Sequence, residues 1–273
     1  MFYPRVVAYG FAQGKCAWLC GCRGRDYAGL CRIFLLMSIE KIRISDYRNI
    51  VVLTGAGISV ASGIAPFRGP GGLWTDHDIE RCATARALRK RPQVVWEAFA
   101  ELRRSARVTK PNPTHFALAE LEKHRPNTMI LTQNIDGLHQ AAGSKNEVEL
   151  HGNIHRTRCT HCQREPYDDT SVEFANCDIC GHALRYDIVL FEENLDGDDM
   201  DRAVRSLQQC DLFITAGTSG IVWPAAGFSQ IARAAGALTV LVNLEELPTD
   251  SFDKQFIGKA EQIFPELFDY SGI

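Results

Sequence analysis

The sequence of 273 residues lacks the features that would assign it to several special classes of protein. It has no uninterrupted run of about 18 apolar residues, which argues against a membrane-spanning helix. Its 30 basic and 33 acidic residues nearly balance, so neither a nucleic-acid-binding surface nor an acidic tail is indicated. Internal repeats and low-complexity segments are also absent. With 45% apolar residues, the chain is expected to form one large globular domain, or one domain with a smaller insert.

Cysteine, in contrast, is plentiful, and eight of its ten residues fall into two groups of four. Cys82 and Cys210 are isolated and are expected to be ordinary buried or half-buried thiols. The members of the two groups are Cys16, Cys20, Cys22 and Cys31, and then Cys159, Cys162, Cys177 and Cys180.

The first group lies in residues 1–36, which mix glycine, arginine, cysteine and aromatic residues without a period of 2 or 3.6. A short apolar run at 6–12 follows Arg5, but Gly10 breaks it and the fit to a secretory signal is poor. The cysteine spacings match no common tetrahedral metal site. We interpret residues 1–36 as a leader that is disordered or precedes the native start, for which Met37 is a natural position.

Short apolar runs rich in β-branched residues predict four buried parallel strands, at residues 49–53, 128–132, 211–216 and 238–243. Helical patterns lie between them, for example at 92–105, 114–124, 199–209 and 225–235. Strands that alternate with helices predict an α/β fold with a doubly wound, parallel, Rossmann-like sheet. In such sheets ligands bind at the carboxyl ends of the strands.

A glycine-rich turn follows the first predicted strand. Gly55 and Gly57 let the backbone approach a phosphate, and the start of the next helix favours the phosphate charge. The dinucleotide fingerprint has a third glycine where Val60 stands. It also has an acidic residue about twenty positions later, on a second strand, whereas the acidic residues at 76–80 fall in a predicted polar loop. An ordinary dehydrogenase is therefore disfavoured, as is an NTPase, because the Lys-Ser/Thr of a P-loop is missing. A tight turn without a ligand remains the alternative.

The second group of cysteines forms two CxxC pairs separated by fourteen residues. Each pair places two thiolates on one side of a turn, and two such knuckles supply the four ligands of a tetrahedral zinc ion. Four thiolates leave no position for water, so the zinc is predicted to be structural; a disulfide or redox pair is the alternative. Residues 155–186 are predicted to form a zinc-binding module, whose flanking histidines are expected to face solvent: His155, His161 and His182.

Polar residues follow the ends of the predicted strands. Asn134 and Asp136 come directly after 128–132, where a ribose or a carboxamide would be held, or where they would only cap the next helix. His151, beside a glycine at the junction with the zinc module, is a candidate base. Two further segments would bind ribose or phosphate oxygens, or would be only turns: Gly217-Thr218-Ser219 and Asn243-Leu244-Glu245.

Together these segments resemble the sirtuin family, the NAD-dependent protein deacylases, in order from about Ile50 to Pro265. The chain, which is short and has no long tails, resembles the bacterial members. The motifs that carry the resemblance are Gly55-Ala-Gly-Ile-Ser59, Gly63-Ile-Ala-Pro-Phe-Arg68, Gly72-Leu-Trp74, Thr132-Gln-Asn-Ile-Asp136, His151-Gly-Asn153, the two CxxC pairs, Gly217-Thr-Ser219 and Asn243-Leu-Glu245.

The resemblance implies that NAD binds between the sheet and the zinc module as a co-substrate, and that one structural Zn²⁺ is present. His151 would be the general base, with Asn134 and Asp136 as the other catalytic residues. The implied cofactor-binding residues are Gly55, Ala56, Gly57, Ser59, Phe67, Arg68, Trp74, Gln133, Asn134, Ile135, Asp136, Gly217, Thr218, Ser219, Asn243, Leu244, Glu245 and Ala260.

The implied reaction transfers the acyl group of an acyl-lysine protein substrate to ADP-ribose, giving nicotinamide, O-acyl-ADP-ribose and free lysine. The substrate would contact Val189, Phe191, Phe99 and Leu102. Phe99 and Leu102 stand where desuccinylating members have a tyrosine and an arginine, so we expect acetyl or longer apolar acyl groups. Glu192 stands where the family has a glycine, which puts peptide docking there in question.

The resemblance also implies a domain organisation and two alternative functions. Residues 37–154 and 187–273 would form the NAD-binding domain, with a helical insert at about 70–110, and residues 155–186 the zinc module. A mono-ADP-ribosyltransferase or NAD hydrolase on the same scaffold is the alternative, followed by a non-catalytic NAD-responsive binding module. We expect a cytoplasmic monomer without nucleic-acid or membrane partners.

Overall fold

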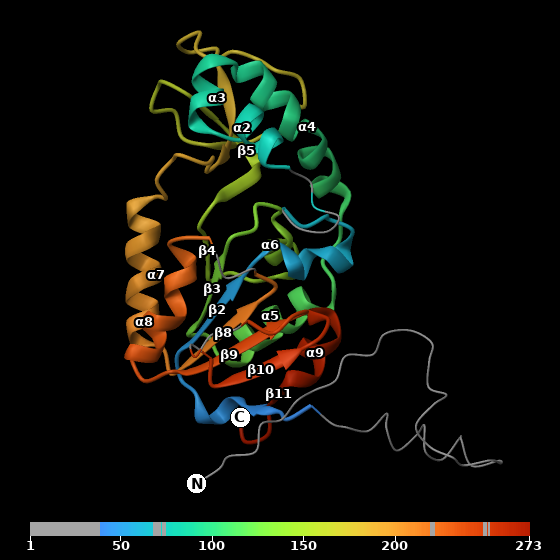
Figure 1. Cartoon of the computed structure of the whole chain (residues 1–273), viewed down its shortest axis with the longest axis vertical. Coiled ribbons are helices and arrows are strands. Elements are labelled where there is room, and N and C mark those ends of the chain that lie inside the picture. The colour runs from blue at the N-terminus through green and yellow to red at the C-terminus, as the bar shows by residue number, and fades with distance from the viewer. Residues whose placement is uncertain (1–38, 68–71, 73–74, 219–221, 248–249, 251) are drawn as a thin grey trace, which may run out of the picture.

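The computed structural model describes residues 39–67, 72, 75–218, 222–247, 250 and 252–273, so the predicted leader lies outside the described residues. The described chain forms an elongated body with a parallel sheet and its helices at one end. A smaller group of helices and strands lies at the other end (Figure 1). Segments between these two parts carry most of the candidate site.

The large sheet has six strands, and every pairing between neighbours is parallel. The strands at 128–132 and 238–243 occupy the predicted residues, and those predicted at 49–53 and 211–216 begin one residue later. In spatial order the strands are β10 (Lys254–Ile257), β9 (Leu238–Asn243), β8 (Leu212–Ala216), β2 (Ile50–Thr54), β3 (Thr128–Thr132) and β4 (Glu147–Glu149).

Both faces of this sheet are covered by helices, which explains why its central strands are continuous apolar runs. Ile50 and Val52 of β2 belong to one cluster with α5 (Pro113–His124) and α9 (Ala260–Leu267). Val51 and Leu53 point to the opposite face, because successive side chains of a strand alternate. There they pack with two other helices (Figure 1): α7 (Gly197–Gln209) and α8 (Phe228–Ala234).

The smaller part combines three helices with a three-stranded antiparallel sheet of order β6-β5-β7. Trp96, Phe99 and Tyr186 share one core, so the helices pack directly on the strands of the predicted zinc module. The acidic residues at 76–80 lie in a helix rather than in the expected loop. The elements are α2 (Asp76–Cys82), α3 (Ala85–Lys90), α4 (Pro92–Val108), β5 (Gly152–Cys159), β6 (Tyr167–Asp168) and β7 (Leu184–Ile188).

The other elements are short. A two-stranded parallel pairing joins β1 (Ile42–Arg43) to β11 (Phe268–Asp269) at the far end of the sheet domain. Across the part of the chain that the structure describes, no helix is long and apolar enough to cross a membrane. The remaining elements are η1 (Ile44–Asp46), η2 (Ala56–Ser62), η3 (Ala225–Gly227) and α6 (Leu138–Ala142).

Candidate functional site

The glycine-rich turn after β2 lies against the turn after β8. The N–H of Gly57 donates to the carbonyl of Gly217 at 2.8 Å, and a Cβ on Gly57 would lie 2.8 Å from Cα of Gly217. Gly217 itself has φ +59°, and a Cβ there would approach the backbone nitrogen of Ile58 to 2.5 Å. Glycine is therefore required where the two backbones meet, in addition to any contact with a phosphate.

Three predicted residues form a buried polar cluster at the carboxyl ends of β2 and β3. Asn134 donates from Nδ2 to the carbonyl of Gly55 at 3.1 Å, and Ser59 donates from Oγ to Oδ2 of Asp136 at 2.7 Å. The backbone N–H of Leu138 donates to the other carboxylate oxygen at 3.0 Å. Burial raises the pKa of Asp136, whereas these two hydrogen bonds oppose that rise. The cluster links the glycine turn to the loop after β3.

His151 lies between β4 and β5, and its ring is held by the loop after β3. Its Nδ1 is 2.9 Å from the carbonyl of Gln133. Because a carbonyl can only accept, Nδ1 carries the proton and Nε2 of the neutral ring is left as a base. Burial lowers the pKa of His151, which favours the neutral ring, although the bond to Gln133 opposes this. Gln133 also reaches the turn after β8, through a 3.3 Å contact with Oγ1 of Thr218.

The segment after β7 connects His151 to the helical part. The N–H of Val189 donates to the carbonyl of His151 at 2.9 Å. Phe191 exchanges backbone hydrogen bonds with Ala83 and Ala85, each of 2.9 Å. Its ring centroid lies 5.8 Å from that of Phe67, which comes from the segment after η2. The segment of Phe191, expected to contact the substrate, and the segment of Phe67, expected to bind the cofactor, therefore lie against each other through two aromatic rings.

The other predicted residues fall into three groups. Phe99 and Leu102 lie on α4 in or against the core of the smaller part, where Phe99 is 6.3 Å from the ring of Tyr186. At the carboxyl end of β9, the Nδ2 of Asn243 donates to the carbonyl of Glu245, and the side chain of Leu244 is exposed. Ala260 is buried at the start of α9. Arg68, Trp74 and Ser219 lie outside the described residues.

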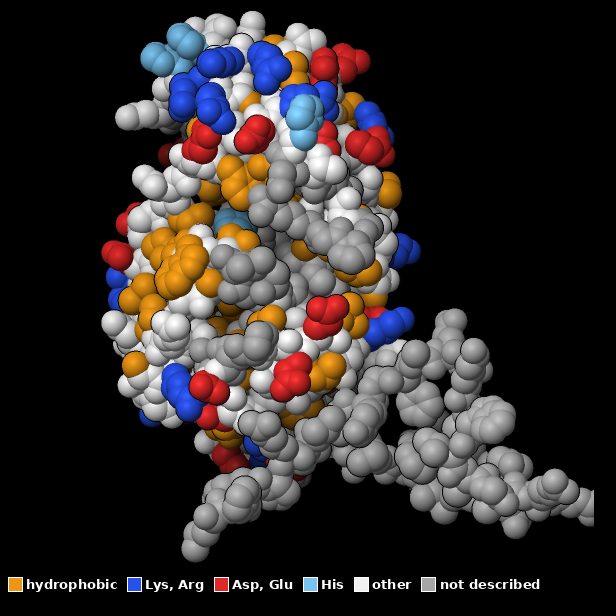
Figure 2. All heavy atoms as spheres, in the orientation of Figure 1, with side chains coloured by type: hydrophobic (Ala, Val, Ile, Leu, Met, Phe, Trp, Pro, Cys, Tyr) orange, Lys and Arg blue, Asp and Glu red, His pale blue; other side chains and the backbone are white. Residues whose placement is uncertain are grey.

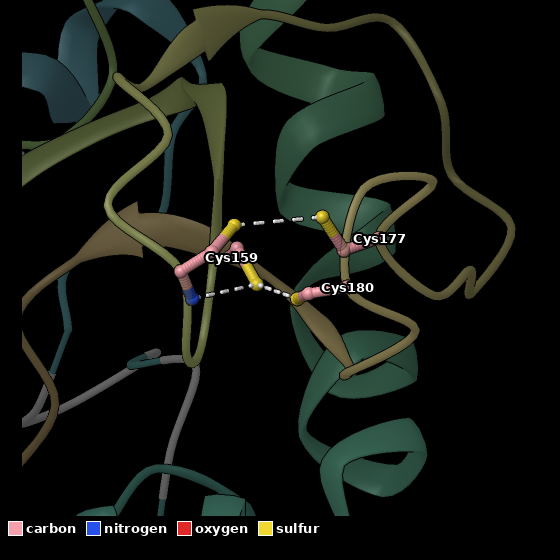
Figure 3. Close-up of side chains that lie close together, drawn as sticks. Cys159, Cys177 and Cys180 are labelled. Carbon is pink, nitrogen blue, oxygen red and sulfur yellow. Dashed lines mark hydrogen bonds between the residues drawn. The ribbon is translucent and has the colours of Figure 1, made fainter.

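The four cysteines of the two CxxC pairs converge as zinc ligands would, and three of them, Cys159, Cys177 and Cys180, are labelled in Figure 3. Their Sγ atoms all lie within 4.8 Å of one another; the pair Cys159–Cys180 is 3.5 Å apart and Cys162–Cys177 is 3.7 Å apart. A disulfide needs about 2.05 Å between sulfurs, whereas Zn–S bonds of about 2.3 Å in a tetrahedron give sulfurs about 3.8 Å apart. The residues present therefore fit a structural zinc ion.

His155 differs from the expectation that it faces solvent. It is half-buried, and its Nε2 lies 3.0 Å from the carbonyl of Asp136. His161 and His182 are exposed, as expected, and stack on each other with centroids 4.0 Å apart. The sequence carries no local signal for the contact of His155, because it depends on how β5 bends.

The front of the molecule in Figure 2 shows hydrophobic side chains gathered along the middle, between the sheet and the smaller part. Charged side chains are more frequent at the end formed by α2, α3 and the strands β5 to β7. The described site residues come from the turns after β2, β3 and β8, from the segment before β5 and from the segment after β7. Their side chains thus combine buried oxygen acceptors, a free imidazole nitrogen and aromatic rings.

Comparison with known proteins shows a match to the Sir2 family over residues 55–224. An NAD-dependent protein deacylase of Aquifex aeolicus is 43% identical over 226 residues, which are 81% of this chain and 95% of that protein. NAD-dependent protein deacylase 1 of Caldanaerobacter subterraneus is 45% identical over 216 residues, covering 77% and 88%.

Solved structures agree with these sequence matches. A Sir2 homologue in complex with NAD has a TM-score of 0.76 and 38% identity, covering 82% of this chain and 89% of that one. A Sir2 complex with a p53 peptide and NAD⁺ has a TM-score of 0.72 and 33% identity, covering 81% and 92%.

Proposed function

The chain belongs to the Sir2 family and is an NAD-dependent protein deacylase, and from this premise we propose which of its residues perform the reaction. One water molecule is consumed as the acyl group of an acyl-lysine in a protein substrate is transferred to ADP-ribose, with release of nicotinamide and free lysine. When bound, NAD supplies the ribose whose bond to nicotinamide breaks and which receives the acyl group. The zinc ion holds the module of the two CxxC pairs together.

His151 is the general base of this proposal. The single observation that carries the assignment is the 2.9 Å contact of its Nδ1 with the carbonyl of Gln133. This contact places the proton on Nδ1 and leaves Nε2 unprotonated in the neutral ring. Nε2 takes a proton from a ribose hydroxyl, which activates that oxygen toward the acyl carbon. Asn134 and Asp136 hold the ribose and the carboxamide, and Phe67 and Phe191 exclude water from the reacting atoms.

The test is a deacylation assay on acetyl-lysine peptides with and without NAD, followed by mass spectrometry. We expect nicotinamide, O-acetyl-ADP-ribose and free lysine in equal amounts, and a loss of 10²-fold or more in kcat for His151→Asn. His124→Asn is the matched control, because His124 is a half-exposed side chain on α5 paired with Glu120. The acidic limb of kcat/KM should have an apparent pKa below 6.5, because burial lowers the pKa of His151.

Radiolabel from NAD that stays on protein would instead support mono-ADP-ribosyl transfer, and nicotinamide release without free lysine would support NAD hydrolysis. A cellular role that survives His151→Tyr would support the binding module. We also propose that acetyl or apolar acyl groups are preferred, because Phe99 and Leu102 offer no cation to an acyl carboxylate. A higher kcat/KM on succinyl-lysine than on acetyl-lysine peptide would overturn this preference.

We further propose that the protein works as a monomer in the cytoplasm, on protein substrates. Free thiolates that fit zinc support a reducing compartment. Light scattering on a size-exclusion column should give one chain per particle, and cell fractionation should recover the protein with the cytoplasm.

A further inference from the structure

Strand β5 contains an irregularity next to the candidate site. Asn153 pairs with Asp187 of β7 and Thr157 pairs with Tyr186, so adjacent residues of β7 face residues of β5 that are four positions apart. The three residues between them, 154–156, therefore bulge out of the pairing with β7. Bulges of this kind redirect side chains, and they are common beside functional sites.

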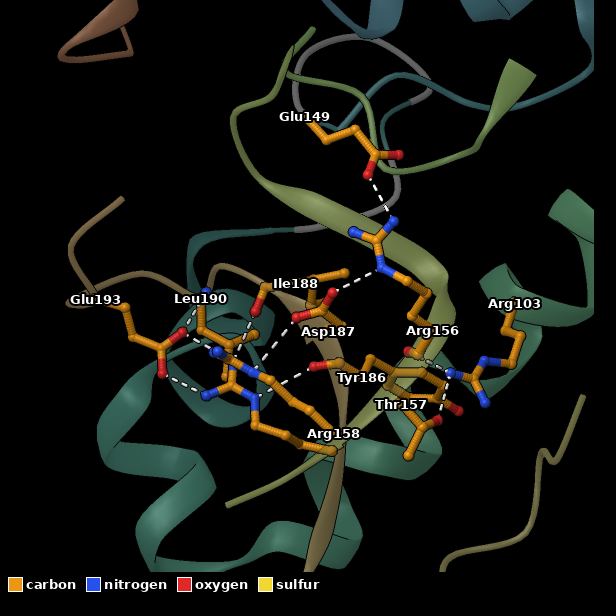
Figure 4. A network of polar contacts seen from close by, with 11 residues as sticks. Arg103, Glu149, Arg156, Thr157, Arg158, Tyr186, Asp187, Ile188, Leu190 and Glu193 are labelled. Carbon is orange, nitrogen blue, oxygen red and sulfur yellow. Dashed lines mark hydrogen bonds and ion pairs between the residues drawn. The ribbon is translucent and has the colours of Figure 1, made fainter. Parts of the chain in front are cut away.

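Arg103 of α4 holds this bulge in place (Figure 4). Its side chain is fully buried, its Nε donates to the carbonyl of Ile154 at 2.7 Å, and its Nη2 donates to the carbonyl of Arg156 at 2.8 Å. The guanidinium also lies over the ring of Tyr186, 4.1 Å from the centroid. Its remaining acceptors are Oγ1 of Thr157, Oδ2 of Asp169 and the carbonyl of Ser171. All five N–H donors of the guanidinium group are thus satisfied.

The bulge in turn contacts the loop that carries Asp136. The N–H of Ile154 donates to the carbonyl of Ile135 at 2.8 Å, and Nε2 of His155 lies 3.0 Å from the carbonyl of Asp136. The His155 ring covers Gly137, where a Cβ would lie 2.9 Å from ring atom Cδ2. Three consecutive loop residues are therefore in contact with two residues of the bulge.

The direction of the His155 side chain is fixed by its own backbone. Its N–H donates to Oδ1 of Asn153 at 2.8 Å, and its carbonyl accepts from the N–H of Asp169 at 2.9 Å. A carbonyl can only accept, so the contact with Asp136 requires a proton on Nε2, which both the neutral and the charged ring can provide.

We propose that His155 is a positioning residue that fixes the main chain of Asp136 and thereby aims its buried carboxylate at the bound nucleotide. The inference rests on the proposed role of Asp136 in holding the ribose and the carboxamide. Arg103 shapes the bulge, the bulge presents His155, and His155 clamps the loop from the side of the zinc module. This contact joins the two parts at a different place from the hydrogen bond between Val189 and His151.

The test compares His155→Asn with His155→Gln, because both are amides but only glutamine has the length to reach the carbonyl of Asp136. Binding of NAD and of ADP-ribose is measured by calorimetry on the full chain, without acyl substrate. We expect His155→Asn to weaken NAD binding about tenfold and ADP-ribose binding less, since ADP-ribose lacks the carboxamide. We expect His155→Gln to stay within about twofold of the wild type, as should the control His124→Asn.

A general folding defect would weaken both nucleotides equally and would lower the melting temperature or the zinc content, so both are measured for each variant. Equal NAD affinity for wild type and His155→Asn would overturn the inference, as would equal losses for the two amides. If the wild type binds NAD with the expected variant order but releases no lysine from peptides, the proposed function fails and this inference stands. A wild type that binds neither nucleotide overturns both.

Discussion

At the scale of single residues, Glu192 has a backbone conformation that favours glycine. Its φ is +70°, which costs an L-residue about 1 kcal/mol or more relative to glycine. Its carboxylate compensates by accepting from the N–H of Arg86 at 3.1 Å and lying 3.4 Å from the guanidinium of the same residue. The side chain thus ties the segment after β7 to the first turn of α3, beside the backbone pairing of Phe191.

This balance predicts different outcomes for two small replacements. Glu192→Ala keeps the backbone strain and loses the carboxylate, so we expect a loss of about 1 kcal/mol in the free energy of unfolding. Glu192→Gly loses the same contacts but relieves the strain, so it should lie within about 0.5 kcal/mol of the wild type. Urea unfolding measures both, and an alanine variant as stable as the glycine variant would contradict the prediction.

At the scale of secondary-structure elements, Arg103 attaches α4 to β5, whereas the adjacent Arg104 makes its ion pair within α4. Arg103 is fully buried with an ion pair to Asp169, and burial lowers its pKa, whereas Arg104 is exposed and pairs with Glu101 on the same helix. Removing one partner of a buried ion pair leaves the other uncompensated. The helix therefore offers a test and its control in adjacent positions.

We expect Arg103→Met to lower the free energy of unfolding by about 3 kcal/mol or more, because Asp169 loses its ion-pair partner and two carbonyls of the bulge lose the donors that Arg103 supplies. Arg104→Met should change it by less than about 0.5 kcal/mol. Thermal unfolding of both variants at one pH provides the comparison. Similar losses for the two positions would show that the buried network contributes little.

The helices and strands also show which sequence signals were sufficient to predict secondary structure. Strand β3 matches its predicted residues because its three apolar residues, between Thr128 and Thr132, are flanked by buried threonines and lie on both faces of the sheet. Helix α2 lies within the helical insert predicted at about 70–110, but its acidic residues were wrongly expected in a loop, although Thr75 and Asp78 form a capping box with the spacing expected at a helix start. Strands β4 and β10 were missed because they are short and partly polar: Glu147–Glu149 and Lys254–Ile257.

The candidate site likewise has parts that the sequence predicts and parts that it does not. The turn after β2, the polar residues after β3 and the four cysteines are recognisable because each motif is local. The contact between His155 and the carbonyl of Asp136 could not be predicted, because it depends on the bulge in β5. That bulge is held by Arg103, which donates to the carbonyl of Ile154, 51 residues later in the chain. The glycine requirement at the turn after β2 likewise depends on Gly217, which belongs to a distant strand end.

At the scale of the whole molecule, two histidines are fully buried, His115 on α5 and His139 on α6. Burial lowers the pKa of His115 to about 4, and burial together with the neighbouring His115 lowers that of His139 to about 3. Their ring centroids are 5.1 Å apart. The unfolded chain protonates each near its ordinary pKa of 6.5, so the unfolded state binds more protons below that pH. Folding stability contributed by these groups is therefore lost as the pH falls.

The expected effect is isolated by comparing the wild type with His115→Gln. One histidine with a depressed pKa contributes a slope of about 1.4 kcal/mol per pH unit. Between about pH 6 and pH 4.5 the stability of the wild type should fall relative to the variant by about that amount per unit. Urea unfolding at several pH values measures the difference in the free energy of unfolding between wild type and variant. A difference that does not change with pH would contradict the prediction, because it would mean that His115 is charged in the folded state or accessible to water.

Metal content is a second property of the whole chain. We expect one zinc per chain by elemental analysis, because four cysteines converge in the described residues and the first cysteine group has no metal-site spacing. Cys177→Ser should abolish zinc binding and lower the melting temperature, since two strands and α4 share a core with the cysteines. Cys82→Ser, at a cysteine far from the cluster in sequence, should retain one zinc. A content of two would reassign the first group.

The central position of β2 has a consequence for how the chain reaches its native state. Ile50 pairs with Thr128 on one side and with Leu212 on the other, and the second pairing closes a loop of 162 residues. Such non-local parallel pairing is slow, because the entropy of loop closure is lost before the contacts form. A chain emerging from the ribosome therefore exposes one edge of β2 until β8 has been synthesised. During that interval β2 is an apolar strand open to intermolecular pairing, so we expect yield to depend on chaperones that shield it.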